Sequence, residues 1–367
     1  MKYFLIITIV FAYSLSVLGQ LDVKTNKNPR KLCFEKSTDR MGQRYVDWEC
    51  GKDKRVLDCN EKLELDPGSN LILLASNGRP FDGACETCHS NGLLERKVTF
   101  LNGQTHGYDT TYYPSGCPQV VRNHIEGVEN GTWVFYNDTS GIEAWRISFF
   151  NGEKHGQSIY FNQYVVGTAE LDVKIGNSTE KLTYNLYESD TLKIEYYKQG
   201  LLDGTKTEYF PGSKVKKEVN YKEGVFNGPF IIYNVEGVVL QELNYLNGQK
   251  DGEWKYYYEN GQLLKIENWK QNVKVGAFKT FYIQGHLQVV ENYDQKGRPD
   301  GEFMEWFPDE KVRREAIYKK GELIEEHVFD KFGNEIKTFG ASPKSGKEDD
   351  DVPTAKSKKR RLKKKKK

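Results

Sequence analysis

Short runs of alternating apolar and polar residues, separated by turn residues, fill most of this chain. Residues 248–272, GQKDGEWKYYYENGQLLKIENWKQN, show the pattern in full. The Asn260-Gly261 pair separates the two runs, and Asn-Gly in that place predicts a β-hairpin because both residues tolerate a positive φ. No useful helical period occurs between residues 83 and 340, so strands and tight turns are predicted throughout.

The pattern repeats at a fixed period. A glycine, in most units preceded by Asp, Asn or His, stands before each aromatic-rich run, and successive marker glycines are 24 or 25 residues apart with one interval of 48. Such a period indicates a repeat array. The long interval is expected to hold a second, degenerate unit across residues 162–199. The nine marker glycines are Gly83, Gly107, Gly131, Gly156, Gly204, Gly228, Gly252, Gly276 and Gly301.

Aromatic residues keep the same register. Some stand two residues after a marker glycine, as Trp254 does, and others stand near the end of the returning run, as Trp269 does. We expect these side chains to stack between neighbouring strands and to supply the apolar burial that a single sheet lacks. The most regular set stands five residues after the marker: Tyr112, Tyr136, Phe161, Tyr209, Tyr233, Tyr257, Phe281 and Trp306.

The predicted fold is therefore all-β, an elongated antiparallel β-meander of about ten 24-residue hairpin repeats over residues 76–340. Residues 1–19 begin with a short basic start and an apolar run, which is typical of a secretory signal peptide. A retained membrane anchor is the alternative, but the run is shorter than the roughly 20 residues that a spanning helix needs. Residues 20–75 do not repeat and are predicted to cap the array.

Charge separates the C-terminal residues from the rest of the chain. Residues 341–367 carry 12 Lys or Arg and 4 Asp or Glu, a formal charge of +8, which leaves −6 for the preceding residues because the whole chain carries +2. This low-complexity segment is predicted to be disordered. It could be a nuclear or nucleic-acid signal, could adhere to anionic lipid, polysaccharide or the acidic body, or could only keep the protein soluble. Export argues against a nucleic-acid partner.

Six cysteines all lie in the first third of the chain, an even number that suits disulfide formation after export. Cys85 to His89 fits C-x-x-C-H, the pattern of covalent haem attachment. Aligned on the repeat, however, this segment is a strand in which cysteines replace aromatic residues, and no second C-x-x-C pair accompanies it for zinc. We expect neither cofactor nor metal, but disulfides or buried free thiols at Cys33, Cys50, Cys59, Cys85, Cys88 and Cys117.

Catalysis is not expected. Paired carboxylates can serve acid–base chemistry, but carboxylates that recur with a repeat are predicted to be solvated partners of exposed lysines. His106 and His155 stand where other units have Asp or Asn, and are expected to cap turns. The recurring carboxylates on the returning runs are Glu218, Glu242, Glu267, Glu291 and Glu315.

The repeat unit resembles the MORN repeat variant, as found in bacterial YwqK-type antitoxin proteins. WKYYYENGQLLKIENWKQNVKVGAFKTFY (254–282), YFPGSKVKKEVNYKEGVFNGPFIIY (209–233) and NYLNGQKDGEWKYYY (244–258) carry the resemblance, which covers roughly residues 76–330. It implies an elongated β-meander that serves as a binding scaffold. The signal peptide, the cysteine-bearing segment and the basic tail depart from the family.

These observations predict a non-enzymatic, exported scaffold in a bacterial periplasm or cell envelope, or outside the cell. Its partner would be an unknown protein or an anionic envelope surface, with no transmembrane span after signal cleavage. The alternative is a YwqK-type antitoxin that neutralises a partner toxin by direct binding, although an export signal suits a cytoplasmic toxin poorly.

Overall fold

The computed structural model describes residues 50–51, 55–175 and 178–340. The predicted signal peptide, Cys33 and the basic residues 341–367 lie outside these residues. Strands dominate the described residues, which hold one helix, α3 (Cys59–Lys62). Twenty-five strands belong to one sheet and two form a separate hairpin, so the all-β prediction is confirmed. The chain divides into two compact units: unit 1 runs to Gly252 and includes Tyr256–Gly261, and unit 2 holds Glu253–Lys255 and the residues from Gln262 on.

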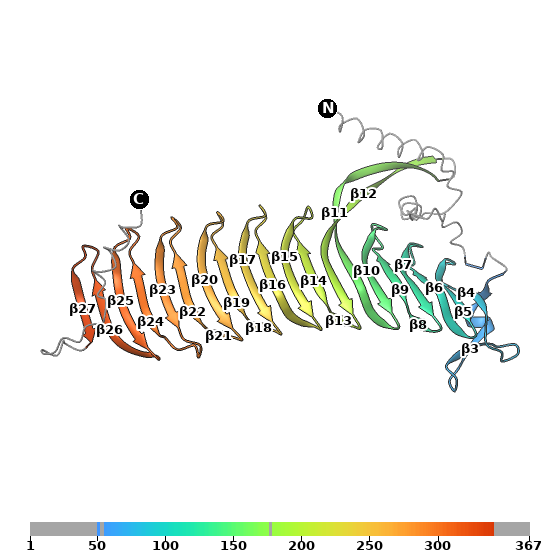
Figure 1. Cartoon of the computed structure of the whole chain (residues 1–367). Coiled ribbons are helices and arrows are strands. Elements are labelled where there is room, and N and C mark those ends of the chain that lie inside the picture. Colours follow the sequence, from blue (N-terminus) through green and yellow to red (C-terminus); the bar gives the residue numbers. More distant parts are fainter. Residues whose placement is uncertain (1–49, 52–54, 176–177, 341–367) are drawn as a thin grey trace, which may run out of the picture. The chain divides into compact units, whose positions relative to one another are not determined.

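In unit 1, consecutive strands pair antiparallel as a meander (Figure 1). Three very short strands, β8 (Val128–Glu129), β13 (Leu201–Leu202) and β18 (Gln249–Lys250), flank the turns between hairpins. The main strands are β4 (Gly83–Cys88), β5 (Leu94–Leu101), β6 (Gln104–Tyr112), β7 (Pro118–Ile125), β9 (Gly131–Tyr136), β10 (Glu143–Phe150), β11 (Glu153–Ile175), β12 (Ser178–Lys198), β14 (Gly204–Tyr209), β15 (Val215–Lys222), β16 (Val225–Tyr233), β17 (Val239–Leu246) and β19 (Gly252–Tyr257), whose residues divide between the units.

Unit 2 continues the same pattern with antiparallel neighbours. Its strands are β20 (Leu263–Lys270), β21 (Val273–Lys274), β22 (Gly276–Phe281), β23 (Leu287–Tyr293), β24 (Gly301–Trp306), β25 (Val312–Lys319), β26 (Glu322–Phe329) and β27 (Glu335–Gly340). The last hairpin, β26–β27, follows the final marker glycine and forms a repeat that the glycine spacing does not reveal.

The 48-residue interval holds one hairpin, not two. β11 and β12 pair with each other from Gly156↔Tyr197 to Ile175↔Ser178, so residues 162–199 contain no second unit. In Figure 1 the two strands run past the tips of their neighbours as a two-stranded arm. The expected number of about ten units holds because the additional hairpin is β26–β27.

Two kinds of turn alternate along the array. In most turns between hairpins, both central residues adopt positive φ, as at Asn247 (49°) and Gly248 (78°), which is the type I′ pattern. At most hairpin tips one glycine alone does so, as at Gly261 (82°), and the strand register shifts beside most tips. The prediction of a hairpin at Asn260-Gly261 is confirmed, since β19 and β20 are neighbours in the sheet, but only Gly261 of the pair adopts positive φ. The sequence shows where the chain turns, and the bulge selects the turn type.

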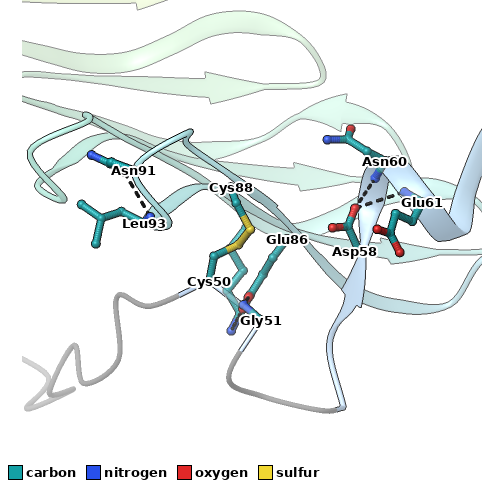
Figure 2. Close-up of a disulfide and its surroundings, with 10 residues drawn as sticks. Cys50, Gly51, Asp58, Asn60, Glu61, Glu86, Cys88, Asn91 and Leu93 are labelled. Atoms are coloured by element: carbon teal, nitrogen blue, oxygen red, sulfur yellow. Dashed lines mark hydrogen bonds and ion pairs between the residues drawn. A yellow bond between two sulfur atoms is a disulfide. The ribbon is translucent and has the colours of Figure 1, made fainter.

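The cap contains β1 (Leu57–Asp58), α3, and the hairpin of β2 (Leu63–Asp66) and β3 (Leu71–Leu74). β1 pairs with β4 in parallel, with Leu57 opposite Cys85. Asp58 caps α3 by accepting hydrogen bonds from the backbone N–H groups of Asn60 and Glu61 (Figure 2). The side chains of Leu57, Leu63, Ile72 and Leu74 pack on a buried cluster of Phe81, Cys85 and Val98.

Register separates the aromatic residues into two faces. Phe278 lies opposite Glu291, and Phe303 lies opposite Ala316. Because strand residues alternate between faces, these residues share one face with Tyr293 and its equivalents; we call it the ladder face. Tyr233, five residues after its marker, donates to Glu218 on the other face. The single aromatic stack predicted from the sequence is therefore divided between both faces.

Candidate binding surfaces

Aromatic rings fill the ladder face of unit 2. The side chains of Trp254, Phe278 and Phe303 are 3, 4 and 7% exposed. Their rings alternate with those of the returning strands, and the centroid distances of 4.5–6.1 Å suit tilted and edge-to-face contacts. The rings bury one another, so this face is the core of the unit and leaves little of the rings for a ligand. The series is Trp254, Trp269, Phe278, Tyr293, Phe303 and Tyr318.

Charged groups occupy the same face in parts of unit 1. Glu195 is 4% exposed and lies 3.0 and 3.1 Å from the Nζ atoms of Lys193 and Lys206. The Tyr197 hydroxyl also donates to it, at 3.0 Å. Burial by itself raises the pKa of Glu195, but these hydrogen bonds outweigh burial and hold the pKa below its usual value. Burial, followed by the charge of Glu195, raises the pKa of Tyr160 to about 12.

A second buried charge lies nearer the cap. Asp109 is 2% exposed; Arg96 Nε donates to one of its carboxylate oxygens at 2.8 Å and Arg122 Nη1 to the other at 3.3 Å. Two guanidinium groups thus satisfy one buried carboxylate, as a buried charge requires. Like Glu195, Asp109 is used inside the fold and is not presented to a substrate.

The recurring carboxylates do not share one position. Glu267 and Glu291 lie on the ladder face, whereas Glu218 and Glu242 lie on the other, where Tyr233 and Tyr257 donate to them at 3.0 and 2.8 Å. Glu267 is 7% exposed and accepts from Trp269 Nε1 at 3.0 Å. Glu267 is also ion-paired with Lys265, so the prediction of solvated partners of lysines is right about the lysine and wrong about solvation for Glu267.

Asparagines that the sequence analysis overlooked explain the marker glycines. The side-chain amides of Asn220 and Asn244 donate to the Pro229 and Asp251 carbonyls, beside Gly228 and Gly252, at 3.0 and 3.2 Å. A Cβ on Gly228 would lie 3.5 Å from Asn220 Cβ, and the φ of Gly228 is +105°. The glycine therefore accommodates both the turn and the side chain across it. The signal was present in the sequence as the 24-residue series Asn220, Asn244, Asn268 and Asn292.

One predicted turn cap is confirmed. His106 Nδ1 accepts a hydrogen bond from the backbone N–H of Glu126 at 3.4 Å, in the next turn, and Asp203 accepts from Glu223 in the same way at 3.3 Å. The loop side chain of one hairpin thus holds the left-handed residue of the following turn. His155 instead lies against the Phe150 ring.

The C-x-x-C-H segment is held by disulfides. Cys85 bonds to Cys59, and Cys88 bonds to Cys50, beside Glu86 (Figure 2). Neither thiol is then available for a thioether bond to haem. Cys117 is also disulfide-bonded, so the disulfide prediction is confirmed for the five cysteines that the structure describes.

A cleft of about 480 Å³ lies at the tips of the first two hairpins and is lined by Thr87, His89, Arg96, Tyr113 and Gln119. Its polar groups already have partners: His89 Nε2 lies 2.9 Å from the Tyr112 carbonyl oxygen, and Arg96 is bound to Asp109. Among the residues that the structure describes, no group of three or more His, Cys, Asp or Glu side chains is placed to hold a metal ion.

Two features of unit 1 remain exposed. One is the arm: β11 pairs with β10 only as far as Tyr160, and β12 pairs with β14 only at Lys193 and Ile194. Beyond these residues the outer edge of each strand has no neighbouring strand among the described residues. The other feature is a row of side chains 42 to 56% exposed beside the turns between hairpins, which we call the turn-edge strip: Leu101, Ile125, Val128, Phe150, Leu201, Val225 and Leu246.

Comparison with known proteins bears on the repeat type. A family model described as MORN repeat variant matches residues 202–223 and 250–271. A search of curated proteins gave no significant match. Among solved structures, "Crystal Structure of TcdB2-TccC3-TEV" aligns with 69% of this chain at 12% identity and a TM-score of 0.13, and the alignment spans 15% of that chain. So weak a likeness carries no argument. No helix in the described ranges is long and apolar enough to cross a membrane.

Proposed function

We propose that this chain is a non-enzymatic, exported repeat scaffold that binds a protein partner through its β-sheet. Two of its hairpins match the MORN repeat variant, and repeats of this type suggest a binding scaffold. Disulfides persist in oxidising compartments, so the bonded cysteines support export, here to a periplasm, a cell envelope or the medium. The buried carboxylates are engaged by neighbouring cations and hydroxyls, which favours a structural role over catalysis.

The unpaired strand edges of the arm are the main support for this proposal. Within the part of the chain that the structure describes, its two strands leave their outer backbone N–H and C=O groups without a partner strand from residue 161 onward in β11 and before residue 193 in β12. Soluble proteins usually cover or blunt such edges, because an unpaired edge is a template for another strand. An extended segment of a partner can add to the edge by main-chain hydrogen bonds, and its alternate side chains then give specificity.

Site-specific crosslinking tests this function. A photo-crosslinking residue at Thr168, on the arm, is expected to capture a discrete partner in the native secreted or envelope fraction. The same residue at Ile283, an exposed tip position of the β22–β23 hairpin, is the matched control. Replacing residues 162–191 by a two-residue turn should abolish capture while leaving the β-sheet circular dichroism intact. Equal capture at both positions, or capture by the armless chain, would refute the arm as the binding element.

The antitoxin alternative also requires direct binding. It predicts that co-expression of this chain rescues growth arrest caused by a toxin, and that the rescue requires the cytoplasmic form without residues 1–19. Rescue by that form would favour the antitoxin, whereas partner capture that occurs only after export favours the scaffold. Fractionation of the native cells, with the disulfides as a marker of export, separates the two.

A further inference from the structure

The turn-edge strip is continuous along unit 1. Six successive type I′ turns each carry at least one of its residues, on the face opposite the ladder face, where Phe150 and Leu246 directly follow the ladder residues Phe149 and Tyr245. Neighbouring turns lie close together: a Cβ on Gly152 would meet Val128 at 3.5 Å, and one on Gly224 would meet Leu201 at 3.7 Å. Monomeric soluble proteins rarely expose so extended an apolar row.

The fold itself does not require apolar residues in this row. In unit 2, the residues that follow the ladder aromatics are Lys270, Asp294 and Lys319, and Glu322 lies opposite Lys319 across its turn. The same backbone geometry therefore accepts charge. The apolar residues of unit 1 need a reason other than the stability of the hairpin.

The centre of the strip is complementary to itself under a two-fold rotation. Numbered along the chain, the turns begin at Leu101, Ile125, Phe150, Lys198, Lys222 and Leu246. If a second copy is rotated about an axis between the third and fourth turns, the first turn meets the sixth, the second meets the fifth, and the third meets the fourth. Because the rotation also reverses the order of residues within each turn, Leu101 then faces Gln249 and Leu246 faces Gln104.

Charges match under the same rotation. Phe150 lies opposite Glu153 across the third turn, and Lys198 lies opposite Leu201 across the fourth. After the rotation, Phe150 of one copy therefore faces Leu201 of the other, and Glu153 faces Lys198. Both charged side chains are exposed, and neither forms an ion pair with another residue that the structure describes. In the second and fifth turns, Ile125 faces Val225 and Val128 faces Lys222. Opposite charges at mirrored places are what an isologous interface needs.

We propose that the turn-edge strip binds a second copy of this chain, antiparallel, about a two-fold axis between the turns at Phe150 and Lys198. The interface places Phe150 of each copy against Leu201 of the other, with a Glu153–Lys198 ion pair on either side of the axis. Because this edge is separate from the strand edges of the arm, the dimer leaves both arms available for the proposed partner.

Charge reversal and rescue test the dimer on the full secreted chain. Sedimentation equilibrium should give twice the chain mass, and both Glu153→Lys and Lys198→Glu should raise the dimer dissociation constant about tenfold or more, since each change places like charges together twice. The double variant Glu153→Lys/Lys198→Glu should restore association to within about threefold, because the exchange of charges recreates the pairs.

Apolar variants supply the second measurement. Phe150→Glu with Leu201→Glu should give a monomer at every concentration, whereas the control Ile317→Glu, at an exposed position of unit 2, should leave the dimer unchanged. Circular dichroism separates loss of association from loss of fold. A monomeric wild-type chain, a dimer that Phe150→Glu does not weaken, or failure of the charge exchange to rescue would each overturn the proposal. If the wild-type chain is monomeric, the strip would have to bind a different protein.

Discussion

The first hairpin and the hairpins of unit 2 bury the ladder face of the sheet in different ways. At corresponding places on the ladder face, the first hairpin has Cys85 opposite Val98, and the β24–β25 hairpin has Phe303 opposite Ala316. Cys85 and Val98 are each 1% exposed because the cap covers them and disulfides hold the cap in place. Phe303 is buried by the rings beside it. A single sheet can therefore be closed by a second layer or by large side chains of its own.

The largest effect is expected where rings alone supply the burial. Phe278→Ala should lower the free energy of unfolding of unit 2 by about 4 kcal/mol, since truncating a buried aromatic removes its contacts and leaves a cavity. Urea unfolding followed by tryptophan fluorescence measures the change. Phe332→Ala, at a position 74% exposed, is the control and should cost almost nothing. A loss below about 1 kcal/mol for Phe278→Ala would show that the ladder is not a core.

The cap should depend on its disulfide to a similar extent. Cys59→Ala with Cys85→Ala removes a link across 26 residues, which is expected to cost about 3.5 kcal/mol in the chain-entropy account. Hydrogen exchange should then increase in β4 and β5, while β22 to β25 keep their protection. Equal loosening of both regions would contradict the division drawn between them.

A third disulfide is expected to involve Cys117. Cys117 is bonded, and Cys33 is the one cysteine of the chain outside the described residues. Non-reduced peptide mapping is therefore expected to find Cys33 linked to Cys117, in addition to Cys50–Cys88 and Cys59–Cys85. A free thiol at Cys33, or a Cys117 linked between two copies, would contradict it.

The stability of the region around Glu195 in unit 1 should depend on pH, whereas the burial of the aromatic rings of unit 2 should not. Because its hydrogen bonds hold the folded-state pKa of Glu195 below the usual value of 4.5, the carboxylate contributes stability above that pH, which is lost as the pH falls through the lowered pKa. Glu195→Gln should cost about 2 kcal/mol at pH 7 and flatten this acid dependence. Thermal melts between pH 3 and 7 measure both, and an unchanged acid limb in the variant would refute the assignment.

The smallest effect is expected at the asparagine that spans the marker glycine. Asn244→Ala should cost about 1 kcal/mol, the usual worth of one hydrogen bond to a partly buried carbonyl. Asn220→Ala should cost at least as much, because Asn220 donates to the Pro229 carbonyl and also accepts a hydrogen bond from Thr205 at 2.6 Å. Gln249→Ala, at an exposed position beside the turn, should not change the midpoint of urea unfolding. A smaller loss at Asn220 than at Asn244 would contradict this expectation.

The local rules of the fold could be predicted from the sequence. A period of 24 residues, glycines at fixed places and alternating aromatic runs depend on turn geometry and strand pleating, which act over a few residues. For the same reason the hairpin units, the strand class and the replacement of aromatics by Cys85 and Cys88 in the first unit follow from the residues. The turn cap at His106 follows likewise.

Only the tertiary structure decided which residues face each other. One residue of register moves a side chain to the opposite face, so Glu218 and Glu267, which look equivalent in the sequence, lie on different faces. Pairing between distant strands made one long arm of the 48-residue interval and joined Cys59 to Cys85. The turn-edge strip emerged in the same way, because its residues are scattered over about 150 positions and become neighbours only when successive turns stack along one edge.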